Sequence, residues 1–177
     1  MIILPLHYFI HVKLFFVVKY LQSLQLSLLN KTIIMPYTTN HSDFIQEQET
    51  RLHNYFNTNR EKLLGFGTKE AFINWYMGEL YHNECKCHYC NTSILDIRHL
   101  LNNQVVLGRN VRGAAIRGAN MEIDRMDPEM AYEPGNCVLS CYYCNNDKSN
   151  TFSYEIYRNV IGPTRYQIWM DLMRRLN

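Results

Sequence analysis

Several structural signals lie close together in Met121–Asn150, MEIDRMDPEMAYEPGNCVLSCYYCNNDKSN. Glu122 and Asp124 lie two residues apart, so in a strand both carboxylates leave the same face. Prolines and a glycine then interrupt regular structure, and the segment 137–140 predicts a returning strand. A C-x-x-C pair closes this hairpin, and a helix is expected to begin at Asn145. The predicted order is therefore strand, loop, strand, cysteine pair and helix.

Cysteines are concentrated in one part of the chain. All six fall within residues 85–144, and four of them form two C-x-x-C pairs. Two thiolates at this spacing reach one tetrahedral ion, whereas they rarely form a structural disulfide with each other. We therefore predict structural Zn²⁺ held by Cys87, Cys90, Cys141 and Cys144. We interpret Cys85 and Cys137 as small buried hydrophobic residues. Zinc-type cysteines favour a reducing, intracellular compartment.

The composition predicts one globular domain. The chain has 177 residues, of which 47% are hydrophobic, so it can bury a core. The formal net charge is only +2, so affinity for nucleic acid must come from local clusters of arginine. We predict a single domain over residues 35–177, made of a helical part at 42–82, a core at 85–150 and C-terminal helices at 153–177.

Residues 1–34 form an apolar N-terminal segment with an unusual pattern. Lys13 and Lys19 interrupt it, and its longest uncharged apolar run is 14–18. A spanning helix needs roughly 20 mostly apolar residues, so no membrane span is predicted. No basic residue precedes the apolar stretch, which argues against a secretory signal. Two interpretations stay open: a misassigned start, with Met35 as the true first residue, or a peripheral helix that binds a membrane or a partner.

Apolar periodicity predicts two helices ahead of the first cysteine pair. The first begins with Ser42 as its N-cap and is ended by the glycines of 65–67. The second runs over 68–81 and carries Trp75 and Tyr76 on its apolar side. We interpret both aromatics as core residues rather than as a base-stacking platform, because stacking platforms lie on exposed surfaces.

The remaining predicted helices lie on either side of the hairpin stretch. Apolar residues mark a short helix over 94–101. After the hairpin stretch, a helix is expected to begin at Ser153 and to be stopped by the Gly-Pro pair at 162–163. The last helix would then begin with a capping box at Thr164.

A glycine-rich segment at 108–120 carries three arginines among small residues: Arg109, Arg112 and Arg117. Glycine allows a backbone to approach a ligand closely, and guanidinium groups bind phosphate through two hydrogen bonds. One interpretation is therefore a phosphate-binding, nucleic-acid-binding loop. The other is a solvated connector without a ligand, and this stretch alone favours neither.

These motifs together resemble the HNH endonuclease superfamily. The shared pattern is C-x-x-C, about 30 residues, E-I-D-R, an aromatic, P-G-N, a short strand and C-x-x-C-N-x-x-K, covering residues 87–157. The resemblance implies an α+β fold in which a small zinc-stabilised ββα-metal unit is embedded among helices. One departure matters, because the family's Asp-His pair reads Asp124-Arg125 in this sequence.

The resemblance also implies roles for particular residues. Asp124 and Asn145 would hold one catalytic divalent cation, and their hard oxygen donors suit Mg²⁺ or Mn²⁺. Asn136 would orient the catalytic base or pin the loop, and Lys148 would neutralise a phosphate. Glu122 would be an accessory ligand or a partner of a ligand.

Arg125 stands where the family has its general base. Arginine stays protonated above pH 12, so it cannot deprotonate water, but it can clamp the scissile phosphate. Tyr132 and His99 are the alternative proton acceptors, although a loop-packing role for Tyr132 and a helix-surface role for His99 are favoured.

Two functional hypotheses follow. The first is a metal-dependent endonuclease or nickase that hydrolyses phosphodiester bonds, with double-stranded DNA as the expected substrate. The second is a zinc-stabilised nucleic-acid-binding module of the same fold without catalysis. The survival of Asp124, Asn136, Asn145 and Lys148 favours the enzyme, because the fold alone does not require them.

Overall fold

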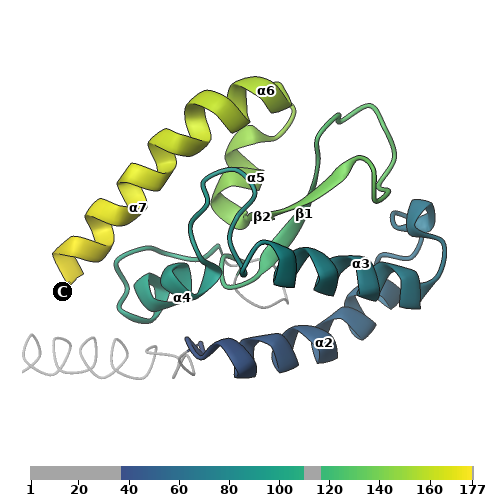
Figure 1. Ribbon diagram of the computed structural model, residues 1–177, viewed down its shortest axis with the longest axis horizontal. Coiled ribbons are helices and arrows are strands. Elements are labelled where there is room, and N and C mark those ends of the chain that lie inside the picture. The colour runs from purple at the N-terminus through teal and green to yellow at the C-terminus, as the bar shows by residue number, and fades with distance from the viewer. Residues whose placement is uncertain (1–36, 110–116, 177) are drawn as a thin grey trace, which may run out of the picture. The chain divides into compact units, whose positions relative to one another are not determined.

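The computed structural model describes residues 37–109 and 117–176 (Figure 1). The predictions for residues 1–34 and for Arg112 lie outside these ranges. The described residues belong to one compact unit that begins at Tyr37. Within them, no helix is both long enough and apolar enough to cross a bilayer.

Two helices open the described chain, α2 at His41–Thr58 and α3 at Lys69–His82, with a short 3-10 turn η1 at Leu64–Phe66 between them (Figure 1). The predicted N-cap of the first helix was wrong. Asn40 caps α2, because its Oδ1 accepts the backbone N–H groups of Ser42 at 2.9 Å and Asp43 at 3.2 Å. Aromatic rings join the two helices, since Phe56 of α2 and Phe72 of α3 lie 5.6 Å apart between centroids.

Tyr76 on α3 confirms the prediction of a core residue. It is 1% exposed, and its hydroxyl donates to the carbonyl of Met121 at 2.8 Å. This bond joins α3 to the first residue of the hairpin. Trp75 is half-buried and packs against the same core.

Helix α4 at Ile94–Asn102 is tied to α2 by a buried arginine. Arg98 is fully buried, and its guanidinium donates to Glu47 at 2.9 and 2.7 Å. Its Nε also donates to the carbonyl of Ala119 at 2.6 Å. This one side chain therefore fixes the segment before the hairpin against two helices.

The centre of the fold is a ββα unit. Strands β1 (Met121–Arg125) and β2 (Cys137–Cys141) pair antiparallel, with Asp124 opposite Val138. Helix α5 follows at once, over Tyr142–Lys148. It begins three residues earlier than predicted, because Cys141 acts as its N-cap and its Sγ accepts the N–H of Cys144. The α+β fold class is as predicted.

The predicted break at residues 162–163 is wrong. Helix α6 (Tyr154–Ile156), a π-helical turn η2 (Tyr157–Ile161) and α7 (Gly162–Leu176) follow one another without a gap (Figure 1). The wider π-turn takes up the misfit of Pro163, which has no N–H to donate. Gly162 is required for close approach, because a Cβ there would lie 2.4 Å from the carbonyl oxygen of Tyr89.

Candidate metal centre and nuclease site

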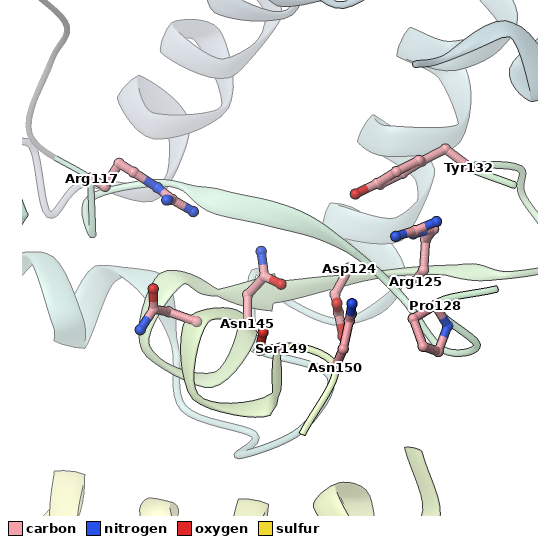
Figure 2. A pocket seen from close by; sticks show the side chains of 9 residues that line it. Arg117, Asp124, Arg125, Pro128, Tyr132, Asn145, Ser149 and Asn150 are labelled. Carbon is pink, nitrogen blue, oxygen red and sulfur yellow. The ribbon is translucent and has the colours of Figure 1, made fainter. Parts of the chain in front are cut away.

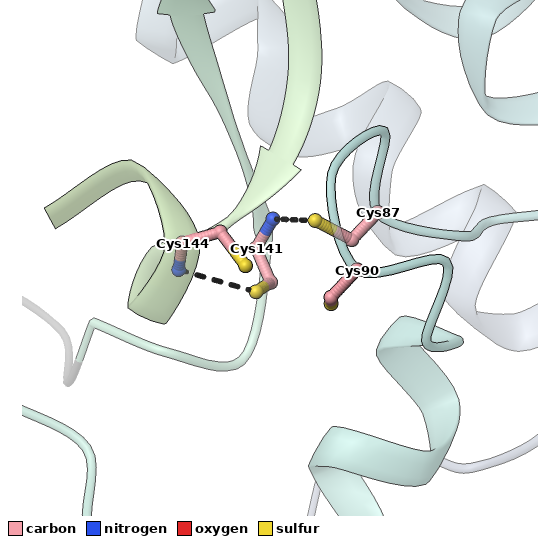
Figure 3. A group of neighbouring side chains, drawn as sticks. All are labelled: Cys87, Cys90, Cys141 and Cys144. Carbon is pink, nitrogen blue, oxygen red and sulfur yellow. Dashed lines mark hydrogen bonds between the residues drawn. The ribbon is translucent and has the colours of Figure 1, made fainter. Parts of the chain in front are cut away.

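The four predicted cysteines meet in one buried cluster (Figure 3). Cys87 and Cys90 come from the turn between α3 and α4, while Cys141 and Cys144 come from the end of β2 and the first turn of α5. Their four Sγ atoms all lie within 4.8 Å of one another. Tetrahedral Zn–S bonds of about 2.3 Å would bring such sulfurs to about 3.8 Å, so the cluster needs little adjustment to hold an ion.

Backbone N–H groups and neighbouring thiols surround the sulfurs of the cluster. The backbone N–H of Cys141 donates to Cys87 Sγ at 3.2 Å, and that of Cys144 donates to Cys141 Sγ at 3.5 Å (Figure 3). Hydrogen bonds from the thiols of Cys141, Cys144 and Cys87 lower the pKa of the Cys90 thiol, whereas burial raises the pKa of the Cys141 thiol. Four soft donors in a closed, buried arrangement are typical of a structural metal site.

The other two cysteines are buried outside the cluster, as predicted. Cys85 is fully buried with its sulfur 3.4 Å from His41 Nε2, and burial raises the pKa of its thiol. Cys137 is 4% exposed on β2, and burial raises the pKa of its thiol to about 11. Both therefore stay protonated at neutral pH and behave as small apolar side chains.

A polar pocket of about 230 Å³ opens beside the ββα unit (Figure 2). It lies against the end of β1, the loop that follows it and the C-terminal half of α5. Its lining residues are Arg117, Asp124, Arg125, Pro128, Tyr132, Asn145, Asn146, Ser149 and Asn150. Four of the predicted site residues thus meet in one cavity: Asp124, Arg125, Asn145 and Arg117.

Asp124 is held from behind by two donors. The hydroxyl of Tyr89 donates to its Oδ2 at 2.6 Å, and Lys148 Nζ lies 3.1 Å from the same oxygen. Burial, reinforced by the charge of Asp124, raises the pKa of Tyr89, so this hydroxyl stays a donor. Within residues 37–109 and 117–176, Oδ1 has no hydrogen-bond partner. One carboxylate oxygen is thus anchored while the other is available at the pocket.

The position of Lys148 differs from the prediction. Its side chain is 1% exposed, and its ammonium bonds Asp124 and the carbonyl of Arg125, the latter at 2.9 Å. These partners occupy the buried ammonium, and Lys148 is not among the residues that line the pocket. Its contribution is to offset the charge of Asp124 and to tie the end of α5 to the end of β1.

Glu122 orients Asn145 rather than offering an oxygen to a metal. Its carboxylate accepts from Arg117 Nε at 2.8 Å and Nη2 at 2.5 Å, and from Asn145 Nδ2 at 2.8 Å. A carboxylate only accepts, so the nitrogen of the Asn145 amide must face Glu122 and Oδ1 must point away from it. Of the two predicted roles of Glu122, the structure shows the partner of a candidate ligand.

Asn136 pins the loop between the strands and does not line the pocket. Its Nδ2 donates to the carbonyls of Asp127 at 2.9 Å and Ala131 at 3.1 Å, and its Oδ1 accepts the N–H of Asp127 at 2.9 Å. The side chain is 3% exposed. Of its two predicted roles, loop fixation is the one that these contacts support.

Arg125 and Tyr132 form one wall of the pocket (Figure 2). The guanidinium of Arg125 lies over the Tyr132 ring, 4.7 Å from its centroid, and Nη1 donates to the carbonyl of Met130 at 3.1 Å. The hydroxyl end of Tyr132 points into the cavity in Figure 2. None of the nine lining residues is a histidine, and His99 lies elsewhere, on α4.

The predicted arginine loop is only partly described. Arg109 is exposed, and its backbone pairs with that of Arg117. These two residues stand on either side of the segment 110–116, which lies outside the described ranges. Arg117 reaches the pocket but is ion-paired with Glu122. Around the pocket, the cations Arg117, Arg125 and Lys148 outnumber the carboxylates of Glu122 and Asp124. This excess of positive charge suits an anionic ligand.

Comparison with known proteins agrees with this geometry. A solved structure of the rare-cutting HNH restriction endonuclease PacI, described for how it perturbs DNA, matches 70% of this chain and 80% of its own chain. The TM-score is 0.53 and the sequence identity is 28%. The chain has an HNH-like fold. No protein-family model matches the sequence, and neither does any curated protein. Because this chain shares its fold with a solved nuclease, the comparison supports a nuclease-like function.

One partner of Asp124, the hydroxyl of Tyr89, was not predicted from the sequence. Tyr89 was not singled out because it lies 35 residues from Asp124 in the chain, inside the C-x-x-C of the first cysteine pair. The available signal was its position: a tyrosine between two metal-binding cysteines is held wherever the metal holds them. No spacing rule gives the direction of its hydroxyl.

Proposed function

We propose that this chain is a metal-dependent endonuclease or nickase that hydrolyses phosphodiester bonds of double-stranded DNA. The observation that carries the proposal is the meeting of Asp124, Asn145 and Arg125 in one polar pocket beside a ββα unit. The likeness to an HNH restriction endonuclease that acts on DNA supports the substrate class.

The donors at the pocket fit a hard divalent cation. The candidate metal ligands are the Oδ1 atoms of Asp124 and Asn145. The other terminal atom of each side chain is already bound: Asp124 Oδ2 to Tyr89 and Lys148, and Asn145 Nδ2 to Glu122. Mg²⁺ is usually held by one or two protein oxygens together with substrate phosphates. When bound, Mg²⁺ or Mn²⁺ would stabilise negative charge on the leaving oxygen.

The residues of the chain supply binding and orientation. Arg125 would bind a non-bridging oxygen of the scissile phosphate, because its guanidinium is at the pocket and has no carboxylate partner in the described chain. Arginine cannot accept the proton of an attacking water. Tyr132 and Ser149 are the lining residues with a hydroxyl, and the hydroxyl of Tyr132 points into the open cavity, where it can relay that proton to solvent, since Asp124 is committed to its donors and to a cation.

The four-cysteine cluster would hold Zn²⁺ in a structural role. The cluster contains no oxygen or imidazole donor. Its four buried sulfurs fill all four positions around a tetrahedral ion, which leaves no position for a substrate. We also infer a reducing, intracellular compartment, because the thiols must stay unoxidised to bind metal.

Nicking of supercoiled plasmid with Mg²⁺ or Mn²⁺ tests the proposal. Asp124→Asn keeps the shape of the side chain but removes the charged oxygen, and we expect at least about a 100-fold loss of cleavage. Tyr132→Phe keeps the ring between its neighbours and removes only the hydroxyl, so it tests the proton relay separately. Zinc content and thermal unfolding of each variant establish that it is folded.

The second candidate is a DNA-binding module without catalysis, which the arginine at position 125 favours. In that case the wild type would bind duplex DNA, but it would cut no faster than Asp124→Asn with either metal. That result would exclude the enzyme. Cleavage that depends on metal and on Asp124 would exclude the module.

A further inference from the structure

The ring of Tyr132 contacts two cations, one of which comes from outside the ββα unit. Lys62 Nζ lies 4.1 Å from the centroid of the ring, and Arg125 Cζ lies 4.7 Å from it. Lys62 belongs to the connection between α2 and α3, about 60 residues before the hairpin in the sequence. Cations in this range of a tyrosine ring are attracted by its electron-rich faces.

The backbone around Lys62 is fixed against the loop that carries Tyr132. A Cβ at Gly65 would lie 2.4 Å from the carbonyl oxygen of Tyr132, so the two segments are in close contact. The neighbouring Leu63 is fully buried, and its N–H donates to the carbonyl of Asn59 at 3.1 Å. The connection is thus anchored directly after Lys62, while the Lys62 residue itself is exposed.

The charge of Lys62 is not neutralised locally. In the described part of the chain, Arg117, Lys148 and Arg165 each form an ion pair with a carboxylate, but Lys62 and Arg125 form none. An exposed lysine held by an aromatic ring rather than by an acid keeps its capacity to bind an anion. Two such cations on one ring create a positive rim beside the pocket.

From this arrangement we propose that Lys62 contacts a backbone phosphate of duplex DNA next to the phosphate bound by Arg125. The inference rests on the proposed function and extends its binding surface to the α2–α3 connection. Lys62 Nζ and Arg125 Cζ lie 4.1 and 4.7 Å from the same ring centroid, so the two cations are less than about 9 Å apart and can reach phosphates close together on one strand, where phosphates repeat about every 3.4 Å along the axis. Such a contact adds affinity without reading sequence.

Salt dependence of DNA binding by the full chain tests this contact. Lys62→Met removes the charge and keeps the aliphatic stem over Tyr132. Fluorescence anisotropy with a labelled duplex, without divalent metal, gives the slope of log K against log salt concentration. We expect this slope to become shallower by about 0.9 for Lys62→Met, by the same amount on unrelated sequences. Lys69→Met is the matched control, because Lys69 is not held over the Tyr132 ring and is not expected to contact the phosphate. The slope of this variant should equal that of the wild type.

The outcomes separate this inference from the proposed function. An unchanged slope for Lys62→Met, or an equal change for Lys69→Met, overturns the phosphate contact even if the wild type cuts plasmid. A wild type that neither binds duplex DNA nor cuts it overturns the proposed function and the contact together. Equal zinc content and equal melting temperatures of the three proteins exclude misfolding as the cause.

Discussion

The cysteine cluster and the pocket are neighbours in sequence but opposite in character. Cys144 and Asn145 are consecutive on α5, yet one side chain enters a closed set of buried sulfurs and the other an open polar cavity. Successive residues of a helix point about 100° apart, which allows one turn to serve both sites. Soft sulfur donors are thus enclosed, as a structural ion requires, while hard oxygen donors stay accessible to a substrate.

The largest effect is expected at the four-cysteine cluster. Cys141→Ser should lose stoichiometric zinc and cooperative thermal unfolding, because structural zinc contributes about 10–16 kcal/mol of apparent binding free energy to small domains. Metal analysis and circular dichroism measure both. Cys137→Ala, a buried cysteine outside the cluster, should keep full zinc and lose only about 1 kcal/mol. Full zinc in a folded Cys141→Ser protein would contradict the four-cysteine site.

The next effect is on the buried ion pair under the pocket. Lys148→Met should lower the free energy of unfolding by about 3–5 kcal/mol, because it leaves the Asp124 carboxylate without its buried cation. Urea denaturation measures the loss. Adding Asp124→Asn to Lys148→Met should restore part of it, since no charge is then stranded. If Lys148 instead serves phosphate, the variant would keep its stability and lose only affinity for DNA.

A smaller effect tests the hydrogen bond from Tyr89 to Asp124, which joins the cysteine cluster to the pocket. Tyr89→Phe should reduce Mn²⁺ affinity at the pocket about 10-fold, because residues that orient a metal ligand typically contribute that much. Loss of a hydrogen bond to a carboxylate should also cost about 1.5–3 kcal/mol of stability.

Isothermal titration with Mn²⁺ and zinc analysis separate the two regions in this variant. Zinc content should not change. The matched control is Tyr157→Phe, whose hydroxyl bonds Asp147 at 3.0 Å rather than the carboxylate of Asp124. Equal Mn²⁺ binding by both variants would show that Tyr89 has no part in positioning Asp124.

The smallest predicted effect concerns how the C-terminal helices meet the first cysteine turn. Gly162→Ala should destabilise by about 1–3 kcal/mol, because its Cβ would clash with the backbone of Tyr89. Gly78→Ala, inside α3, meets no atom within 4 Å and should stabilise by about 0.5–1 kcal/mol. Thermal melts of both variants measure the difference. A neutral Gly162→Ala would show that this helix is free to move away from the turn.

Local sequence rules predicted the elements well where one interaction dominates. Period-two carboxylates and turn residues located β1 and β2, and the C-x-x-C pairs gave the cysteine cluster. The rules failed where a neighbour in space changed the local preference. Gly162 was read as a helix stop, but its lack of a side chain serves a contact with Tyr89.

Residue types and their spacing along the chain are enough to identify the donors: four thiols at a metal-binding spacing, an aspartate and an asparagine, and an arginine in place of a base. Their chemistry depends only on residue type and nearby spacing. Tertiary structure alone decided which atoms are committed. It buried Lys148 against Asp124, turned Glu122 toward Asn145 and brought Lys62 onto the ring of Tyr132. These contacts join segments about 20 to 70 residues apart, which no local periodicity encodes.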